Sequence, residues 1–180
     1  QDPAEKAALA VERSFGENKT GFVNSAMFDL ALPQDRLLLE GAMADLQKKF
    51  PLQVAPTING KRVGENRKEI KNVDPSDLSK IISVQKLANI DDAESAVVAS
   101  ESAFKAWATR APSERAEIVR KAGNILERQK AELSALMVFE VGKSIREADA
   151  DVAEAVDFCR YYADVMEELA GGKNIISRPG

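Results

Sequence analysis

Apolar residues recur at helical spacing over most of the chain, and a more polar stretch of short strands separates two helical zones. After Pro33, apolar side chains recur every three to four residues and Pro51 follows them, which predicts a helix from Pro33 to about Phe50. Earlier, Asp2-Pro3 has the order of an N-cap and a first helical residue, so we expect a short helix over residues 4–15.

The strand zone covers residues 54–88. Asn59-Gly60 stands between two short extended runs, and this pair is the strongest short hairpin signal because both residues tolerate positive φ. Residues 69–73 form a further extended run, the segment 74–77 has the composition of a turn, and residues 80–84 predict a strand.

Four helices are predicted between about Asp91 and Ala170, the first capped by Asp91 or Asp92. Their apolar stripes predict core positions, and on the first helix these are Ala93, Val97, Phe104 and Trp107. Gly142-Lys143-Ser144 superficially resembles a phosphate loop. The first glycine and the preceding strand of that motif are missing, so we interpret the glycine as a helix C-cap.

Composition removes several kinds of chemistry. The 180 residues include 25 Lys and Arg, 29 Asp and Glu, one Cys and no His, so the chain itself holds no Ser-His-Asp or Cys-His site and no His-ligated zinc. A net charge of −4 gives no reason to expect nucleic-acid binding. No apolar run is long enough to span a membrane. The lone cysteine is typical of a reducing compartment, and we expect a cytoplasmic protein.

The last predicted helix is strongly acidic. Asp151, Glu154 and Phe158 share one side of it by their spacing, and a carboxylate there could receive an ammonium or guanidinium group. The alternative is a solvated acidic face. Cys159 lies on the apolar stripe, which favours an inert buried thiol over a nucleophile.

The order of several motifs resembles the aldehyde dehydrogenase superfamily. The motifs are the hairpin at 57–63, the turn at 72–76 (in which Asp74 replaces the usual Asn), the helix at 90–107, Ser113-Glu114-Arg115, Leu126-Glu127-Arg128 and Glu140-Val141-Gly142-Lys143. The run Ala148–Ala163 narrows the resemblance to 1-pyrroline-5-carboxylate (glutamate γ-semialdehyde) dehydrogenases and the dehydrogenase half of bifunctional proline utilization A. Gln1 at the start, and an end in mid-motif, lead us to expect an N-terminal fragment.

The resemblance implies an α/β parent protein, of which this chain is a mainly helical part with a small β-hairpin and strand region. It implies an N-terminal helical arm at 1–53, and at 54–180 the first part of the NAD-binding domain. The parent would oxidise glutamate γ-semialdehyde to glutamate with NAD, and would carry FAD only if fused to a proline dehydrogenase half. Expected partners are the remainder of the chain, the aldehyde and further copies of the parent.

In the resembling family a cysteine thiolate attacks the aldehyde, and a glutamate activates the water that hydrolyses the resulting thioester. Both lie beyond the region matched here, so no catalytic residue is assigned, Cys159 does not inherit the role, and the chain alone is expected to be inactive. Glu154 corresponds to a substrate-binding glutamate, and Asn72 and Glu140 correspond to monovalent-cation ligands. The alternative is a free-standing, non-catalytic interaction module of the same family.

Overall fold

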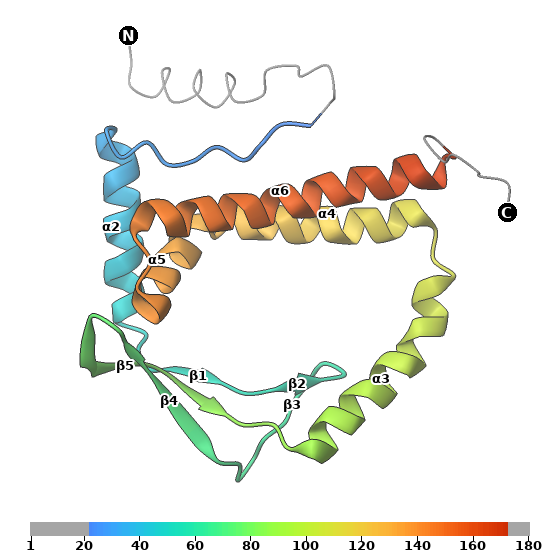
Figure 1. Cartoon of the computed structure of the whole chain (residues 1–180), viewed down its shortest axis with the longest axis horizontal. Helices are drawn as coiled ribbons and strands as arrows, with labels where there is room; N and C mark the ends of the chain where they lie inside the picture. The colour runs from blue at the N-terminus through green and yellow to red at the C-terminus, as the bar shows by residue number, and fades with distance from the viewer. Residues whose placement is uncertain (1–21, 173–180) are drawn as a thin grey trace, which may run out of the picture.

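The computed structural model describes residues 22–172, which fold mainly as helices with two small sheets, as predicted (Figure 1). In chain order the elements are α2 (Pro33–Gln47), β1 (Leu52–Val54), β2 (Thr57–Ile58), β3 (Lys61–Arg62), β4 (Glu69–Asp74), β5 (Asp77–Lys86), α3 (Ile90–Ala108), α4 (Pro112–Arg128), α5 (Lys130–Val141) and α6 (Ile145–Ala170). The helix predicted over residues 4–15 lies outside the described residues. None of the helices within 22–172 is long and apolar enough to cross a membrane.

The strand zone forms a three-stranded sheet and a separate hairpin. In the sheet, β5 lies between β1 and β4, parallel to β1 and antiparallel to β4. Strands β2 and β3 pair around Asn59 (φ 49°) and Gly60 (φ 74°), so the predicted hairpin turn is confirmed. β5 is longer than predicted because its pairing with β4 continues to both strand ends. Strand β1 crosses the predicted boundary at residue 53, and the division into domains stays a prediction.

The core joins the sheet to the helices. Leu46 of α2, Ile82 of β5, and Ala135 and Phe139 of α5 form one buried cluster, and Phe50 packs edge-on against Phe139 with ring centroids 5.4 Å apart. Helices α4 and α6 run side by side, and α5 packs between α2 and α6 (Figure 1). The sheet and α2 therefore position α5, and through it α6.

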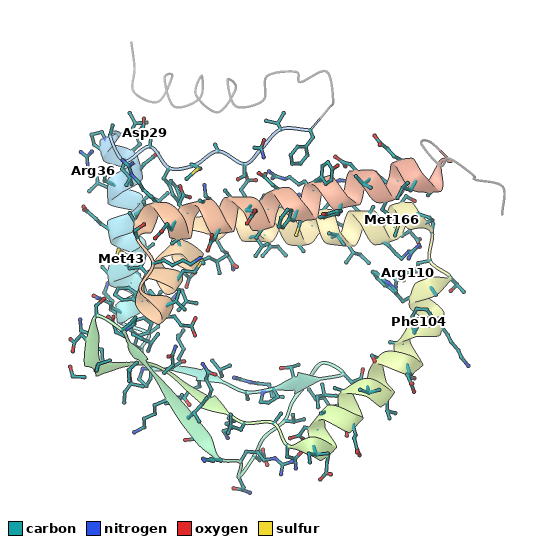
Figure 2. The ribbon with its side chains drawn as sticks, in the orientation of Figure 1. Asp29, Arg36, Met43, Phe104, Arg110 and Met166 are labelled. Carbon is teal, nitrogen blue, oxygen red and sulfur yellow. The ribbon has the colours of Figure 1, made fainter. Side chains whose placement is uncertain are left out.

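The predictions for α3 need two corrections. The N-cap is Asn89 rather than Asp91 or Asp92: its side chain accepts from the Asp92 N–H at 2.8 Å, and the Asp92 carboxylate accepts from the Asn89 N–H at 2.9 Å. This reciprocal capping box satisfies two donors at once and sets the helix start. The predicted core positions are wrong for this helix, since Val97 is 57 % and Phe104 65 % exposed. Figure 2 labels Phe104 on α3. Within residues 22–172 most of this face is uncovered; at its end Trp107 is 39 % exposed and lines a pocket with residues of α4 and α6.

Candidate functional site: a groove along α6

The connection between α5 and α6 places the start of the candidate site. Gly142 ends α5 in the left-handed conformation (φ 72°), and Ser144 caps α6 by accepting from the Glu147 N–H. Lys143 forms an ion pair with Asp151, one to two turns into α6. The C-cap interpretation of the glycine is therefore confirmed.

The segment 22–31 runs without regular secondary structure along α6 (Figure 1). Between them lies a groove of about 460 Å³. Its lining comes from the segment (Phe22, Asn24, Ser25, Met27) and from one stripe of the helix (Ala150, Ala153, Glu154, Asp157, Phe158, Tyr161, Tyr162). We call this space the α6 groove.

Two aspartates of α6 hold the segment in place. Asp157 accepts the Ser25 N–H on Oδ1 at 2.6 Å and the Asn24 side-chain amide on Oδ2 at 2.7 Å. Asp149 accepts the Phe28 N–H on Oδ2 at 2.7 Å. These part-buried backbone N–H groups thus have charged acceptors, which are stronger partners than neutral ones.

A buried ion pair lies beneath this attachment. Lys130 Nζ is 2.7 Å from Asp149 Oδ1, and the two side chains are only 7 % and 4 % exposed. The ammonium also donates to the Ala26 carbonyl and lies 4.7 Å above the Phe28 ring. Burial removes these charges from water, so each must be compensated by the other and by the segment. Sequence reasoning missed Lys130, because nothing in the local pattern marks a buried lysine.

Glu154 lines the α6 groove and differs from both aspartates. Its side chain is exposed, and within residues 22–172 it has neither an ion-pair nor a hydrogen-bond partner. Aromatic rings surround the same groove: Phe22 meets Tyr161 edge-on at 5.5 Å, and Phe158 lies 5.9 Å from Tyr162. An unpaired carboxylate beside aromatic rings favours an organic ammonium group.

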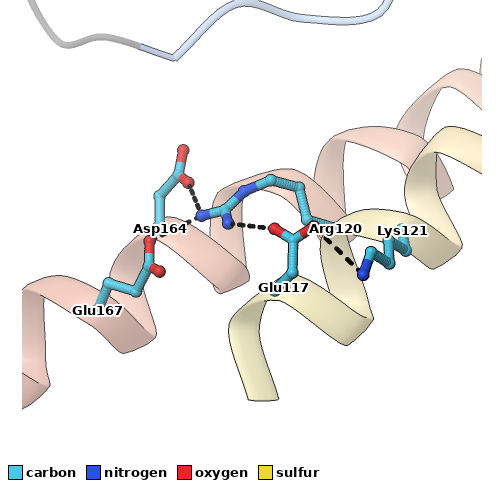
Figure 3. A network of polar contacts seen from close by, with 5 residues as sticks. All are labelled: Glu117, Arg120, Lys121, Asp164 and Glu167. Atoms are coloured by element: carbon cyan, nitrogen blue, oxygen red, sulfur yellow. Dashed lines mark hydrogen bonds and ion pairs between the residues drawn. The ribbon is translucent and has the colours of Figure 1, made fainter. Parts of the chain in front are cut away.

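The other acidic residues of α6 are largely paired within the chain, so the helix is not simply a solvated acidic face. Arg120 of α4 contacts Asp164 at 2.8 Å and Glu167 at 2.7 Å (Figure 3). The hydrogen bonds that Arg120 donates to Asp164 and then to Glu167 raise the pKa of Arg120 above its usual value. These pairs fix α4 against α6.

The other two predicted site residues meet away from the groove. The Asn72 side-chain amide of β4 donates to Glu140 Oε1 of α5 at 3.2 Å. Each side chain keeps one further oxygen that suits a hard cation, but two oxygens are fewer than such ions need. Within residues 22–172, no group of three or more His, Cys, Asp or Glu side chains is placed to hold a metal ion. The cation role stays a prediction.

Cys159 is half-buried and free. It lies where α4 and α6 approach closely, since a Cβ added at Gly123 would be 2.9 Å from the Cys159 Cβ. Its position at this helix contact is that of a packing residue rather than a groove residue.

The aldehyde dehydrogenase family model matches residues 62–180. The chain belongs to this family. It is 41% identical over 152 residues to 1-pyrroline-5-carboxylate dehydrogenase 1 of Halalkalibacterium halodurans, covering 84% of this chain and 29% of that protein. It is 35% identical over 159 residues to the 1-pyrroline-5-carboxylate dehydrogenase of Staphylococcus aureus, covering 88% and 31%.

Solved structures agree with the family. Proline utilization A from Bdellovibrio bacteriovorus, inactivated by N-propargylglycine, matches with a TM-score of 0.83 and 35% identity, over 87% of this chain and 16% of that one. The 1-pyrroline-5-carboxylate dehydrogenase from Thermus with bound NAD matches with a TM-score of 0.81 and 30% identity, over 88% and 31%. The chain thus spans under a third of the length of these relatives.

Proposed function

We propose that this chain is the first part of an NAD-dependent dehydrogenase that oxidises glutamate γ-semialdehyde to glutamate in proline catabolism. The names of the relatives support the reaction, and the NAD-bound Thermus structure supports the cofactor. The remainder of such an enzyme would supply the nucleophile, the NAD site and the contacts between copies. The chain alone is then inactive, and its part in the reaction is to bind substrate.

The observation that carries the proposal is the unpaired Glu154 carboxylate in the aromatic α6 groove. Glutamate semialdehyde bears an α-ammonium group at the end opposite its aldehyde. Glu154 would hold that ammonium by a charge-assisted hydrogen bond, so that the aldehyde points away from α6 toward the rest of the enzyme. Glu154 is favoured over Asp157 for the ammonium because each Asp157 oxygen already accepts a hydrogen bond from the segment, whereas Glu154 accepts none within residues 22–172.

The test is a chimera in which residues 22–172 replace the matched segment of the H. halodurans relative. Glu154→Gln should raise KM for the aldehyde about tenfold or more, the factor for one charge-assisted hydrogen bond, and leave KM for NAD unchanged. The control is Glu168→Gln, which changes an exposed glutamate of α6 outside the groove. An equal rise of both KM values in Glu154→Gln would contradict the substrate role.

The exposed apolar face of α3 favours a second candidate, a free-standing, non-catalytic interaction module. Such a module would bind a partner through this face and need no substrate. An active chimera whose activity depends on Glu154 would decide for the dehydrogenase. An inactive but folded chimera would decide against the dehydrogenase.

A further inference from the structure

We infer that Asp157 is a positioning residue: it holds the segment 22–31 against α6 as the second wall of the groove in which Glu154 binds substrate. The inference rests on the proposed function of Glu154 and assigns a different task to the neighbouring carboxylate. Neither the segment nor Asp157 would touch the reacting atoms.

The two carboxylates lie one turn apart on the same stripe of α6, yet their surroundings differ. Both Asp157 oxygens accept hydrogen bonds from the segment, at 2.6 Å from the Ser25 N–H and 2.7 Å from the Asn24 amide. Within residues 22–172, Glu154 accepts none. Each Asp157 oxygen is thus already engaged by the segment, with one acceptor position left on each, whereas all acceptor positions of Glu154 are open to a ligand. The hydrogen-bond pattern therefore assigns Asp157 to holding the segment and Glu154 to binding the substrate.

The anchors on the helix are slightly farther apart than the extended chain between their partners, so the segment must lie nearly extended along the helix and does not merely cross it. Asp149 and Asp157 are eight residues apart, a rise of about 12 Å along a helix. Their partners, the N–H groups of Phe28 and Ser25, are three residues apart, at most about 10 Å of extended chain. The segment therefore runs antiparallel to α6 with an anchor toward each end.

The two anchors differ in strength, and this makes Asp157 the sensitive one. Asp149 is 4 % exposed and is also paired with Lys130, whereas the Asn24–Asp157 contact is exposed. Loss of Asp157 would remove the hydrogen bonds to Asn24 and the Ser25 N–H, leave the long Ser25 hydroxyl contact to Glu127 (3.4 Å), and leave the Phe28 end attached. The groove would lose one wall while α6 and Glu154 stay in place.

Kinetics of the same chimera test this division. Asp157→Ala should raise KM for the aldehyde about tenfold, with kcat changed less than twofold, because the binding wall is loosened and the chemistry is untouched. Asn24→Ala, which keeps the Ser25 hydrogen bond, should have a smaller effect. A chimera that begins at Leu32 loses the Asp149 anchor as well and should raise KM at least as much as Asp157→Ala.

The decisive comparison combines variants. In the chimera that begins at Leu32, Asp157→Ala should add nothing further, whereas Glu154→Gln should add its full effect. An undiminished effect of Asp157→Ala without the segment would overturn the inference and make Asp157 a substrate ligand. If Glu154→Gln alone has no effect while Asp157→Ala still acts through the segment, the proposed function fails and the positioning role survives.

A second measurement needs no activity. In the 180-residue chain, Asp157→Ala should speed hydrogen exchange at the Ser25 amide about tenfold and leave the Phe28 amide protected, as followed by NMR. Equal loss of protection at both amides, or no loss at Ser25, would overturn the two-anchor arrangement.

Discussion

The buried pair of Lys130 and Asp149 allows the sharpest test of what holds α6 and the segment 22–31 together. The perturbation is Lys130→Met, which keeps an unbranched side chain of similar length and removes the charge. The Asp149 side chain is only 4 % exposed, so its charge stays buried in this variant. The carboxylate loses its counter-ion at 2.7 Å and keeps the Phe28 N–H, also at 2.7 Å, as a partner.

The expected cost is large because the remaining charge stays buried. Removing one partner of a buried ion pair destabilises proteins by about 3–5 kcal/mol. At roughly 2–4 °C per kcal/mol for a chain of this length, the melting temperature should fall by about 6–20 °C. The double variant Lys130→Met/Asp149→Asn should cost only about 1–2 kcal/mol, because the charge is gone and the Asn side-chain carbonyl can still accept from Phe28.

Urea unfolding of the 180-residue chain followed by far-UV circular dichroism measures these differences, and unchanged denaturant slopes show that the variants unfold alike. The matched control is Lys49→Met, which breaks the exposed Lys49–Glu132 pair (2.6 Å; side chains 54 % and 46 % exposed) and should cost about 0–1 kcal/mol. The reasoning is refuted if Lys130→Met costs no more than this control, or if the double variant costs as much as the single one.

Two further predictions concern the packing of a helix and the capping of another. Gly123→Ala should destabilise the chain by about 1–3 kcal/mol in the same assay, since the new Cβ would be 2.9 Å from the Cys159 Cβ; Gly41→Ala, with nothing within 4 Å, should instead stabilise α2 by about 0.5–1 kcal/mol, and equal effects would contradict close helix packing. At the start of α6, hydrogen bonds from the N-cap lower the pKa of Glu147 below its usual 4.5, so its contribution is present above that pH and is lost as pH falls through the lowered value. Glu147→Gln should therefore be less stable than the parent at pH 6, and the difference should shrink as pH falls through the lowered pKa; a difference that does not shrink as the solution is acidified would contradict the capping role.

Local signals in the sequence predicted most of the fold, because turns and helix ends are decided by nearby residues. Asn59-Gly60 and Gly142 both take the positive φ that their residue types predicted. The apolar stripe of α3 was misjudged for a different reason. Periodicity shows that a face is apolar, and it does not show whether the described residues contain its partner.

The candidate site was only partly predictable. Glu154 was found through a resemblance, and the structure gives it a groove and leaves it unpaired. The roles of Asp149 and Asp157 were missed, because both depend on contacts with residues more than 120 positions away. In the sequence they were two of many acids on one helix, and only tertiary structure separates the paired carboxylates from the unpaired one.

The short connection between α5 and α6 determines which side of α6 faces the segment 22–31 and so lines the α6 groove. Only Gly142, Lys143 and Ser144 separate the two helices, and the left-handed glycine lies against the β4–β5 turn, with an added Cβ meeting Pro75 Cγ at 3.0 Å. A helix turns about 100° per residue, so one inserted residue here would rotate the stripe of Glu154 and Asp157 away from the segment 22–31. The three-residue connection is packed against Pro75, so the β4–β5 turn fixes the direction in which the α6 groove opens.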